Sequence, residues 1–121
     1  MIISENSPRF DFQNFAIDTK NGMLFLVLEF MSKTQTSTNQ FFLKIFDLKE
    51  NDKIILETMI ENPTLQGILC SGAYTLVDGH IYYNNNVIKV RYDLIKDKLA
   101  RNLTNDEIFN QYDDILDLQN N

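Results

Sequence analysis

The sequence has little of the two residue types that most often build metal sites and nucleophilic active sites. It holds one cysteine, Cys70, and one histidine, His80. A single cysteine excludes an internal disulfide and fits a reducing compartment. A tetrahedral zinc site needs more of these side chains than the chain provides, and a histidine-based triad would have to be built on His80 alone. We therefore expect no metal and no triad, and interpret Cys70 as a small buried side chain and His80 as a turn residue.

Long apolar runs and phosphate-binding glycine loops are missing as well. The longest apolar run, residues 23–28, is far too short to cross a bilayer. The first residues show no basic region followed by an apolar one, so we expect a cytoplasmic protein without membrane association. Gly67 and Gly72 are not followed by the helix and lysine of a phosphate loop. No cofactor is expected.

Acidic residues are plentiful, and a carboxylate-based enzyme is one hypothesis that the sequence leaves open. In turns, however, an aspartate usually caps its own backbone. The aspartates in such contexts are Asp47, Asp52, Asp78, Asp93 and Asp97. The structural interpretation is favoured, and we predict that the protein is not an enzyme.

The sequence does contain a succession of β-hairpin signals. The central one is the stretch 77–93, where Asp78-Gly79 precedes a short aromatic and β-branched run and Asn84–Asn86 separates it from the next. Tight hairpin turns need the positive φ that these residues tolerate. Met23 to Phe30 is apolar at both strand parities, which predicts an interior strand covered on both faces.

With 121 residues, the chain is predicted to form a single domain, residues 1–121, with an all-β, mainly antiparallel fold. Residues 9–103 form the predicted meander of about eight strands, closed as a small sandwich, a half-barrel or a propeller-like pair of sheets. The predicted strands are 9–17, 23–30, 41–47, 53–60, 68–77, 80–83, 87–92 and 98–103. The predicted core residues are Phe12, Phe25, Val27, Leu43, Ile45, Ile88, Val90, Tyr92, Ile108 and Tyr112.

The last part of the chain changes character. Thr104 and Glu107 fit a capping box, as N-cap and N3. The apolar residues that follow at helical spacing are Ile108, Phe109, Tyr112, Ile115 and Leu116. We therefore predict one amphipathic C-terminal helix over residues 104–118, packed on the β-meander with its acidic side in water.

Negative charge is concentrated in the same stretch. The formal net charge of the chain is −6. Residues 1–103 carry 11 basic and 12 acidic side chains and contribute only −1 of it. Residues 104–121, here called the acidic stretch, carry five acidic and no basic side chains, a net of −5. Such a field repels nucleic acid and anionic membranes and attracts a basic protein. The predicted partner-binding residues are Asp106, Glu107, Asp113, Asp114 and Asp117.

Two stretches, Phe41 to Ile54 and Asp78 to Leu94, resemble consecutive blades of a β-propeller of the kelch or olfactomedin type. Asp47-Leu48 recurs as Asp93-Leu94, 46 positions later, which is a blade-like period. The resemblance implies antiparallel sheets and a role as an interaction module. A sandwich of two four-stranded sheets accommodates the same strands.

In size, acidity and lack of catalytic residues the chain is similar to bacterial immunity proteins. That similarity implies a small cytosolic protein that sequesters a basic partner, most concretely a nuclease toxin, with acidic side chains in place of substrate phosphates. A lipocalin-like carrier is the alternative from another class, with eight antiparallel strands, a C-terminal helix and aromatic residues lining a cavity. The chain has no tryptophan and so lacks the lipocalin Gly-x-Trp signature. The oligomeric state is left open.

Overall fold

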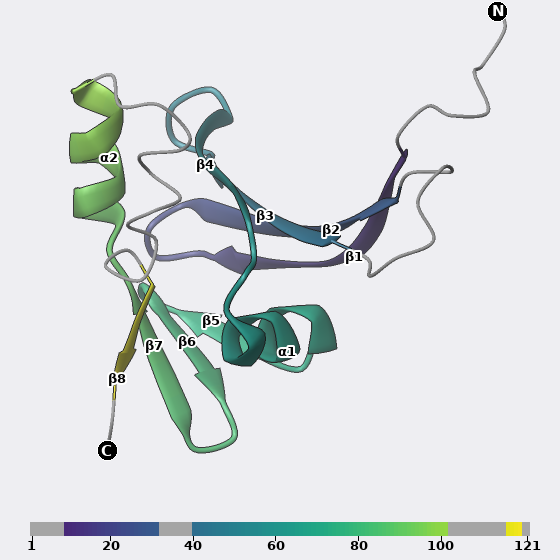
Figure 1. The fold of residues 1–121 in the computed structure, drawn as a ribbon. Helices are drawn as coiled ribbons and strands as arrows, with labels where there is room; N and C mark the ends of the chain where they lie inside the picture. Colours follow the sequence, from purple (N-terminus) through teal and green to yellow (C-terminus); the bar gives the residue numbers. More distant parts are fainter. Residues whose placement is uncertain (1–8, 32–39, 102–115, 120–121) are drawn as a thin grey trace, which may run out of the picture.

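Two four-stranded antiparallel sheets and two short helices make up the described part of the protein (Figure 1). The computed structural model describes residues 9–31, 40–101 and 116–119. Sheet A contains, in chain order, β1 (Arg9–Asp18), β2 (Met23–Met31), β3 (Gln40–Asp47) and β4 (Lys53–Met59). Sheet B contains, in chain order, β5 (Thr75–Val77), β6 (His80–Tyr83), β7 (Asn86–Val90) and β8 (Leu116–Gln119). The prediction of a mainly antiparallel all-β fold with about eight strands is confirmed.

The turns of sheet A contain the residues that the sequence predicts for them. Gly22, in the β1–β2 turn, has a φ of 67°, and its N–H donates to the carbonyl oxygen of Asp18 at 2.8 Å. Asn51 and Asp52, in the β3–β4 turn, have φ values of 54° and 59°. Glycine adopts this left-handed conformation freely, and Asn and Asp adopt it more readily than other residues. The turns thereby set the register of the sheet.

A bulge in β1 changes which of its side chains face the core. The register shifts between Phe12 and Asn14, so that Phe12 lies opposite Leu28 and Asn14 lies opposite the buried Val27. Phe12 therefore lies on the outer face, the side of sheet A turned away from α1 and sheet B, and is 59% exposed. Its predicted place in the core is wrong, because strict alternation along a strand does not anticipate a bulge.

Helix α1 (Pro63–Ser71) connects the two sheets, where the sequence analysis predicts a strand over residues 68–77. That prediction is correct for β5 alone. The oxygen of the Asn62 side chain accepts from the backbone N–H groups of Thr64 and Leu65 at 2.9 and 3.1 Å, and Pro63 suits the first helical position. Leu65, Ile68 and Leu69 form the buried stripe of the helix.

Helix α2 (Tyr92–Ala100) follows β7. The predicted strand over residues 98–103 is wrong for 98–101, and residues 102 and 103 lie outside the described residues. Tyr92, Ile95 and Leu99 recur at helical spacing and contact the core. Both helices span nine residues, and no helix in the described part of the chain is long and apolar enough to cross a membrane.

The eighth strand comes from the end of the chain. Leu116–Gln119 pair antiparallel with β7, with Leu116 opposite Val90 and Asp117 opposite Lys89. The predicted C-terminal helix is therefore wrong for residues 116–118, while its residues 104–115 lie outside the described ones. Leu116-Asp117-Leu118-Gln119 alternates apolar and polar residues, which suits a strand at the edge of a sheet.

The core lies between the inner face of sheet A, helix α1 and sheet B. Of the predicted core, six residues are buried, with at most 4% of their surface exposed: Phe25, Val27, Leu43, Ile45, Ile88 and Val90. Tyr92 is half-buried against them. Ile108 and Tyr112 lie outside the described residues.

Substituting Val90 with aspartate tests this core. Val90 is 4% exposed, so Val90→Asp places an unpaired charge among apolar side chains and should lower the free energy of unfolding by about 3 kcal/mol or more. Val77→Asp is the matched control, because Val77 is 53% exposed in the same sheet; it should cost less than about 1 kcal/mol. Urea unfolding measures both, and equal losses would show that the burial of β7 is misassigned.

Candidate functional site

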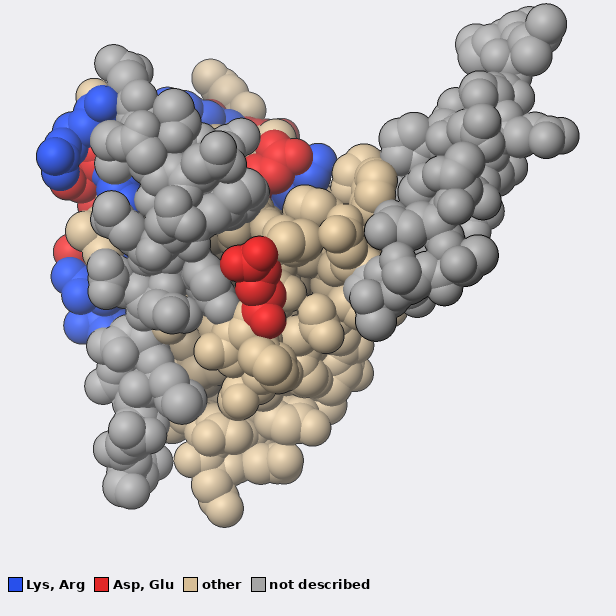
Figure 2. Space-filling model, viewed as in Figure 1, with Lys and Arg blue, Asp and Glu red and all other residues tan. Residues whose placement is uncertain are grey.

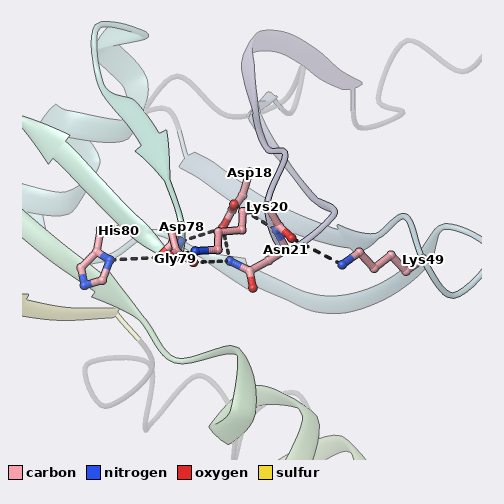
Figure 3. Close-up of polar contacts among 7 residues, drawn as sticks. All are labelled: Asp18, Lys20, Asn21, Lys49, Asp78, Gly79 and His80. Carbon is pink, nitrogen blue, oxygen red and sulfur yellow. Dashed lines mark hydrogen bonds and ion pairs between the residues drawn. The ribbon is translucent and has the colours of Figure 1, made fainter.

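A polar cluster lies where the β1–β2 turn meets the β5–β6 turn (Figure 3). Asp18 ends β1, and the N–H of Gly79 and the hydroxyl of Tyr92 donate to its Oδ2 at 2.7 and 2.8 Å. Asn21 donates to the same carboxylate from Nδ2 at 2.9 Å and from its backbone N–H at 3.3 Å. One carboxylate thus joins sheet A to sheet B and to the start of α2. We call Asp18, Asn21, Asp78, Gly79 and Tyr92 the Asp18 junction.

The Asp18 carboxylate is fully buried and held as an anion. Burial raises the pKa of the carboxyl, but hydrogen bonds from Asn21, Tyr92 and Gly79 together outweigh it and hold the pKa below its ordinary value of 3.8. Burial, and then the bond to Asp18, raises the pKa of the Tyr92 hydroxyl. At neutral pH the acid stays ionised and the phenol stays protonated, so the pair is a fixed structural bond and not a poised proton donor and acceptor.

Gly79 is needed at this junction for its backbone conformation. Its φ is 75°, and a Cβ there would lie 3.6 Å from Cε2 of Tyr92. The carbonyl oxygen of Gly79 also accepts from the N–H of Val90 at 2.8 Å. The Asp78-Gly79 turn therefore contacts both β1 and β7 through one residue.

Charged side chains surround the exposed rim of the junction (Figure 3). Lys20 pairs with Asp78 at 3.3 Å, and Nδ2 of Asn21 donates to Asp78 at 3.2 Å. Because the Lys20 and Asp78 side chains are 73% and 51% exposed, water screens this ion pair, and it contributes at most about 1 kcal/mol. His80 follows the turn, as predicted, with Nδ1 3.0 Å from the carbonyl oxygen of Asp78.

Asp47 fixes helix α2 to the end of β3. Its side chain is 2% exposed and accepts from Nζ of Lys96 at 2.9 Å. The N–H of Lys49 donates to the same carboxylate at 3.0 Å. The Lys96 hydrogen bond is the largest of the effects that hold the pKa of Asp47 below its usual value.

Asn14, at the β1 bulge, fixes helix α1 and the approach to β5. Its Nδ2 donates to the carbonyl oxygen of Leu69 at 2.7 Å, and its Oδ1 accepts from the Tyr74 hydroxyl at 3.0 Å. Burial, and then Cys70, raises the pKa of Tyr74 to about 12, so this donor keeps its proton. The bulge that turns Phe12 outward is also the place where β1 holds the helix.

Cys70 and the acidic groups of the body offer little reactive chemistry. Burial, and then Glu29, raises the pKa of the Cys70 thiol, which packs against the core as the sequence analysis predicts. Among residues 9–31, 40–101 and 116–119, no three His, Cys, Asp or Glu side chains gather as metal ligands would. A half-open hollow of about 220 Å³ lies beside α2, lined by Glu50, Lys53, Ile55, Lys96, Leu99 and Ala100. It is smaller than the roughly 300 Å³ at which pockets for drug-sized ligands begin.

The predicted partner-binding residues are placed only in part. Asp117 lies in β8, at the edge of sheet B, and not on a helix. The other four predicted residues, Asp106, Glu107, Asp113 and Asp114, lie outside the described residues. The sequence analysis interprets Asp47 as a turn residue and does not single out Asp18, whereas these two side chains organise the polar contacts of the body. Their position at strand ends was visible in the sequence, but their distant partners were not.

Comparison with protein-family models, with curated proteins and with solved structures gave no match to this chain. The propeller and immunity-protein resemblances therefore stay predictions.

The Asp18 junction can be tested through its pH dependence. Asp18→Asn should lower the free energy of unfolding at pH 7 by about 2–4 kcal/mol, because the buried donors lose a charged acceptor. The folded pKa is lowered, so this stabilisation is complete above the unfolded value near 3.8 and is lost as pH falls through the folded value.

The difference in the free energy of unfolding between wild type and Asp18→Asn should therefore disappear in acid. Urea unfolding from neutral pH downwards measures it. Asp52→Asn is the matched control, because that side chain is exposed in a turn where asparagine also tolerates the φ of 59°; it should stay within about 0.5 kcal/mol of wild type. A difference in the free energy of unfolding that is independent of pH would show that the Asp18 charge does not stabilise the junction.

Proposed function

We propose that the protein is a small acidic binding protein that sequesters a basic protein partner in the cytoplasm, most concretely an immunity protein that neutralises a nuclease toxin. The observation that carries the proposal is the segregation of charge. The acidic stretch has a net charge of −5, whereas the preceding 103 residues sum to −1. The acidic side chains of this stretch would pair with the Lys and Arg side chains of a nuclease cleft in place of the phosphates of the substrate.

The described fold supports this proposal through the elements on either side of residues 104–115, which carry four of the five acidic side chains of the acidic stretch. Helix α2 ends at Ala100, and Leu116, which is 4% exposed, starts β8 against β7. The acidic residues are therefore attached to the body on both sides. Attachment at two points reduces the conformational entropy that would be lost on ordering them against a partner.

The buried carboxylates favour binding over carboxylate-based catalysis. Asp18 and Asp47 accept hydrogen bonds from groups that hold the sheets and α2 together. A general acid or base needs a pKa near the working pH, whereas both of these pKa values are lowered.

The arrangement of the sheets favours protein binding over a lipocalin-like carrier. Such a carrier needs one closed barrel around a cavity. The described strands form two separate four-stranded sheets. The space between them is filled by side chains such as Phe25, Ile45 and Ile81, each with no exposed surface.

Removing the charges tests the proposal. The partner is first captured on the tagged full chain from cells of the source organism, and we expect a basic protein. The four-fold variant Asp106→Asn, Asp113→Asn, Asp114→Asn and Asp117→Asn should then slow association by about ten-fold or more at low salt, because opposite charges steer the encounter. The effect should be smaller at high salt, where ions already screen these charges. Surface plasmon resonance across salt concentrations measures the rates.

A matched variant controls for total charge. Asp52→Asn, Glu61→Gln, Asp93→Asn and Asp97→Asn remove four exposed acids elsewhere, so both four-fold variants change the net charge from −6 to −2. The control should bind nearly as fast as wild type. Equal slowing by both sets, or by neither, would rule out the acidic stretch as the binding surface. If the captured partner is a nuclease, co-expression with wild type should restore growth that the toxin alone stops.

A further inference from the structure

The outer face of sheet A is apolar across all four strands, although the strand register leaves it facing away from the core. Residues directly opposite one another share a face, so the pairing of β1 to β4 defines its members. Its apolar side chains are Phe10, Phe12, Phe15, Ile17, Leu24, Leu26, Leu28, Phe30, Phe42, Phe46, Ile54 and Met59. Its polar side chains are Gln40, Lys44 and Glu57.

The outer face lacks the polar residues expected of a sheet that has one side in water. Such sheets alternate apolar and polar residues along each strand. On β2, by contrast, the inner Phe25 and Val27 are flanked by outer Leu24, Leu26 and Leu28. No described element covers the outer side, and five of its members are exposed: Phe10 51%, Phe12 59%, Phe15 60%, Ile17 44% and Ile54 41%. The sequence prediction of a strand covered on both faces is thus met on one face only.

Aromatic side chains give part of the outer face a fixed shape. The ring of Phe10 lies 5.1 Å from Phe30 and 5.9 Å from Phe42, and the latter two are 6.0 Å apart, centroid to centroid. Nζ of Lys44 lies 5.9 Å from the Phe10 ring centroid. A cluster that is already packed loses little side-chain entropy when a surface closes over it.

We propose that the outer face of sheet A is the contact surface of a homodimer, with a second copy of this chain as its occupant. Four strands about 4.8 Å apart and eight residues long at about 3.4 Å each present roughly 500 Å². Two such faces in contact remove roughly 1,000–1,200 Å² from water, more than most crystal contacts and close to the smallest stable complexes. Weak and transient complexes fall at this small end of the size range, so we expect a dimer that dissociates at micromolar concentration. The proposal does not depend on the proposed function.

Charge favours a second copy over a lipid surface. The face carries one cation and one anion, Lys44 and Glu57, which pair with each other at 3.5 Å. Its net charge is zero on a chain of net charge −6, so two copies meet here with little repulsion. A bilayer would have to accept this ion pair into hydrocarbon, whereas in a dimer each ion keeps its partner and Glu57 lies on the edge strand β4.

A two-fold axis along the strands, between β2 and β3, completes the geometry. It lays β1 of each copy over β4 of the other, as in an aligned sandwich with sheets about 10 Å apart. The protruding phenylalanines of β1 then meet a strand that presents Ile54, Glu57 and Met59. Two copies of the same face have equal width, so they pack in this way without leaving an uncovered strip.

Sedimentation equilibrium of the full chain tests the proposal. The mass of wild type should rise from 14.2 kDa towards twice that value between about 1 and 200 µM. Phe12→Glu with Phe15→Glu should raise the dimer Kd at least about 100-fold, because two buried charges would then face apolar strands. Both side chains are more than half exposed in one copy, so the variant should keep the wild-type circular dichroism spectrum.

The matched control is Val77→Glu with Tyr82→Glu, two exposed apolar residues of sheet B, 53% and 43% exposed. It should change the Kd less than about two-fold. Ile54→Lys, at the opposite edge of the outer face, gives a second measure and should weaken the dimer as the β1 variant does. Phosphatidylcholine vesicles test for lipid as occupant.

A wild-type mass of 14.2 kDa at every concentration would overturn the proposal. So would equal weakening by the sheet B control, or an unchanged dimer in both the β1 variant and Ile54→Lys. A monomer that binds the vesicles, and loses this binding with the β1 variant, would assign the face to lipid instead.

Discussion

The buried Asp18 carboxylate is the contact on which the relative position of the two sheets depends. Its acceptor oxygens are shared by a turn of sheet A, a turn of sheet B and the first residue of α2. A buried anion is costly unless donors surround it, so once those donors are present few other arrangements satisfy the charge. Asn14 and Asp47 make similar contacts on a smaller scale: Asn14 connects helix α1 to sheet A, and Asp47 connects helix α2 to it. No buried side-chain nitrogen or oxygen within the described residues lacks a hydrogen-bond partner.

Local signals carried most of what the sequence could predict. Turn residues with positive φ and apolar alternation gave the hairpins of both sheets, because each depends on neighbours a few residues apart. Asn62-Pro63 is a recognisable start signal for helix α1. The nine residues of the helix are too few to establish a helical period of apolar residues. Leu116 fits an apolar stripe of a helix as well as an alternating strand, and pairing with β7 decides for the strand. Local sequence patterns could not predict the Asp18 junction, because Gly79 and Tyr92 lie 61 and 74 positions away from Asp18.

The chain thus carries an apolar face and an acidic segment of opposite character. The outer face of sheet A is apolar and carries no net charge, whereas the acidic stretch carries most of the charge of the chain. In Figure 2 the charged side chains gather mainly over α2 and the neighbouring turn, and much of the remaining visible surface is uncharged. A dimer formed through the outer face would carry two acidic stretches, and two linked binding segments raise apparent affinity for a basic partner without any new contact.

Hydrogen exchange with mass spectrometry, with and without the captured basic protein, tests the central claim most directly. We predict that the partner slows exchange of backbone amides in residues 104–119, including β8, and leaves the exchange of the turns of the Asp18 junction unchanged. Protection confined to β1 and β4, with none in residues 104–119, would contradict it, because the partner would then bind the apolar face and the acidic stretch would have no part in recognition.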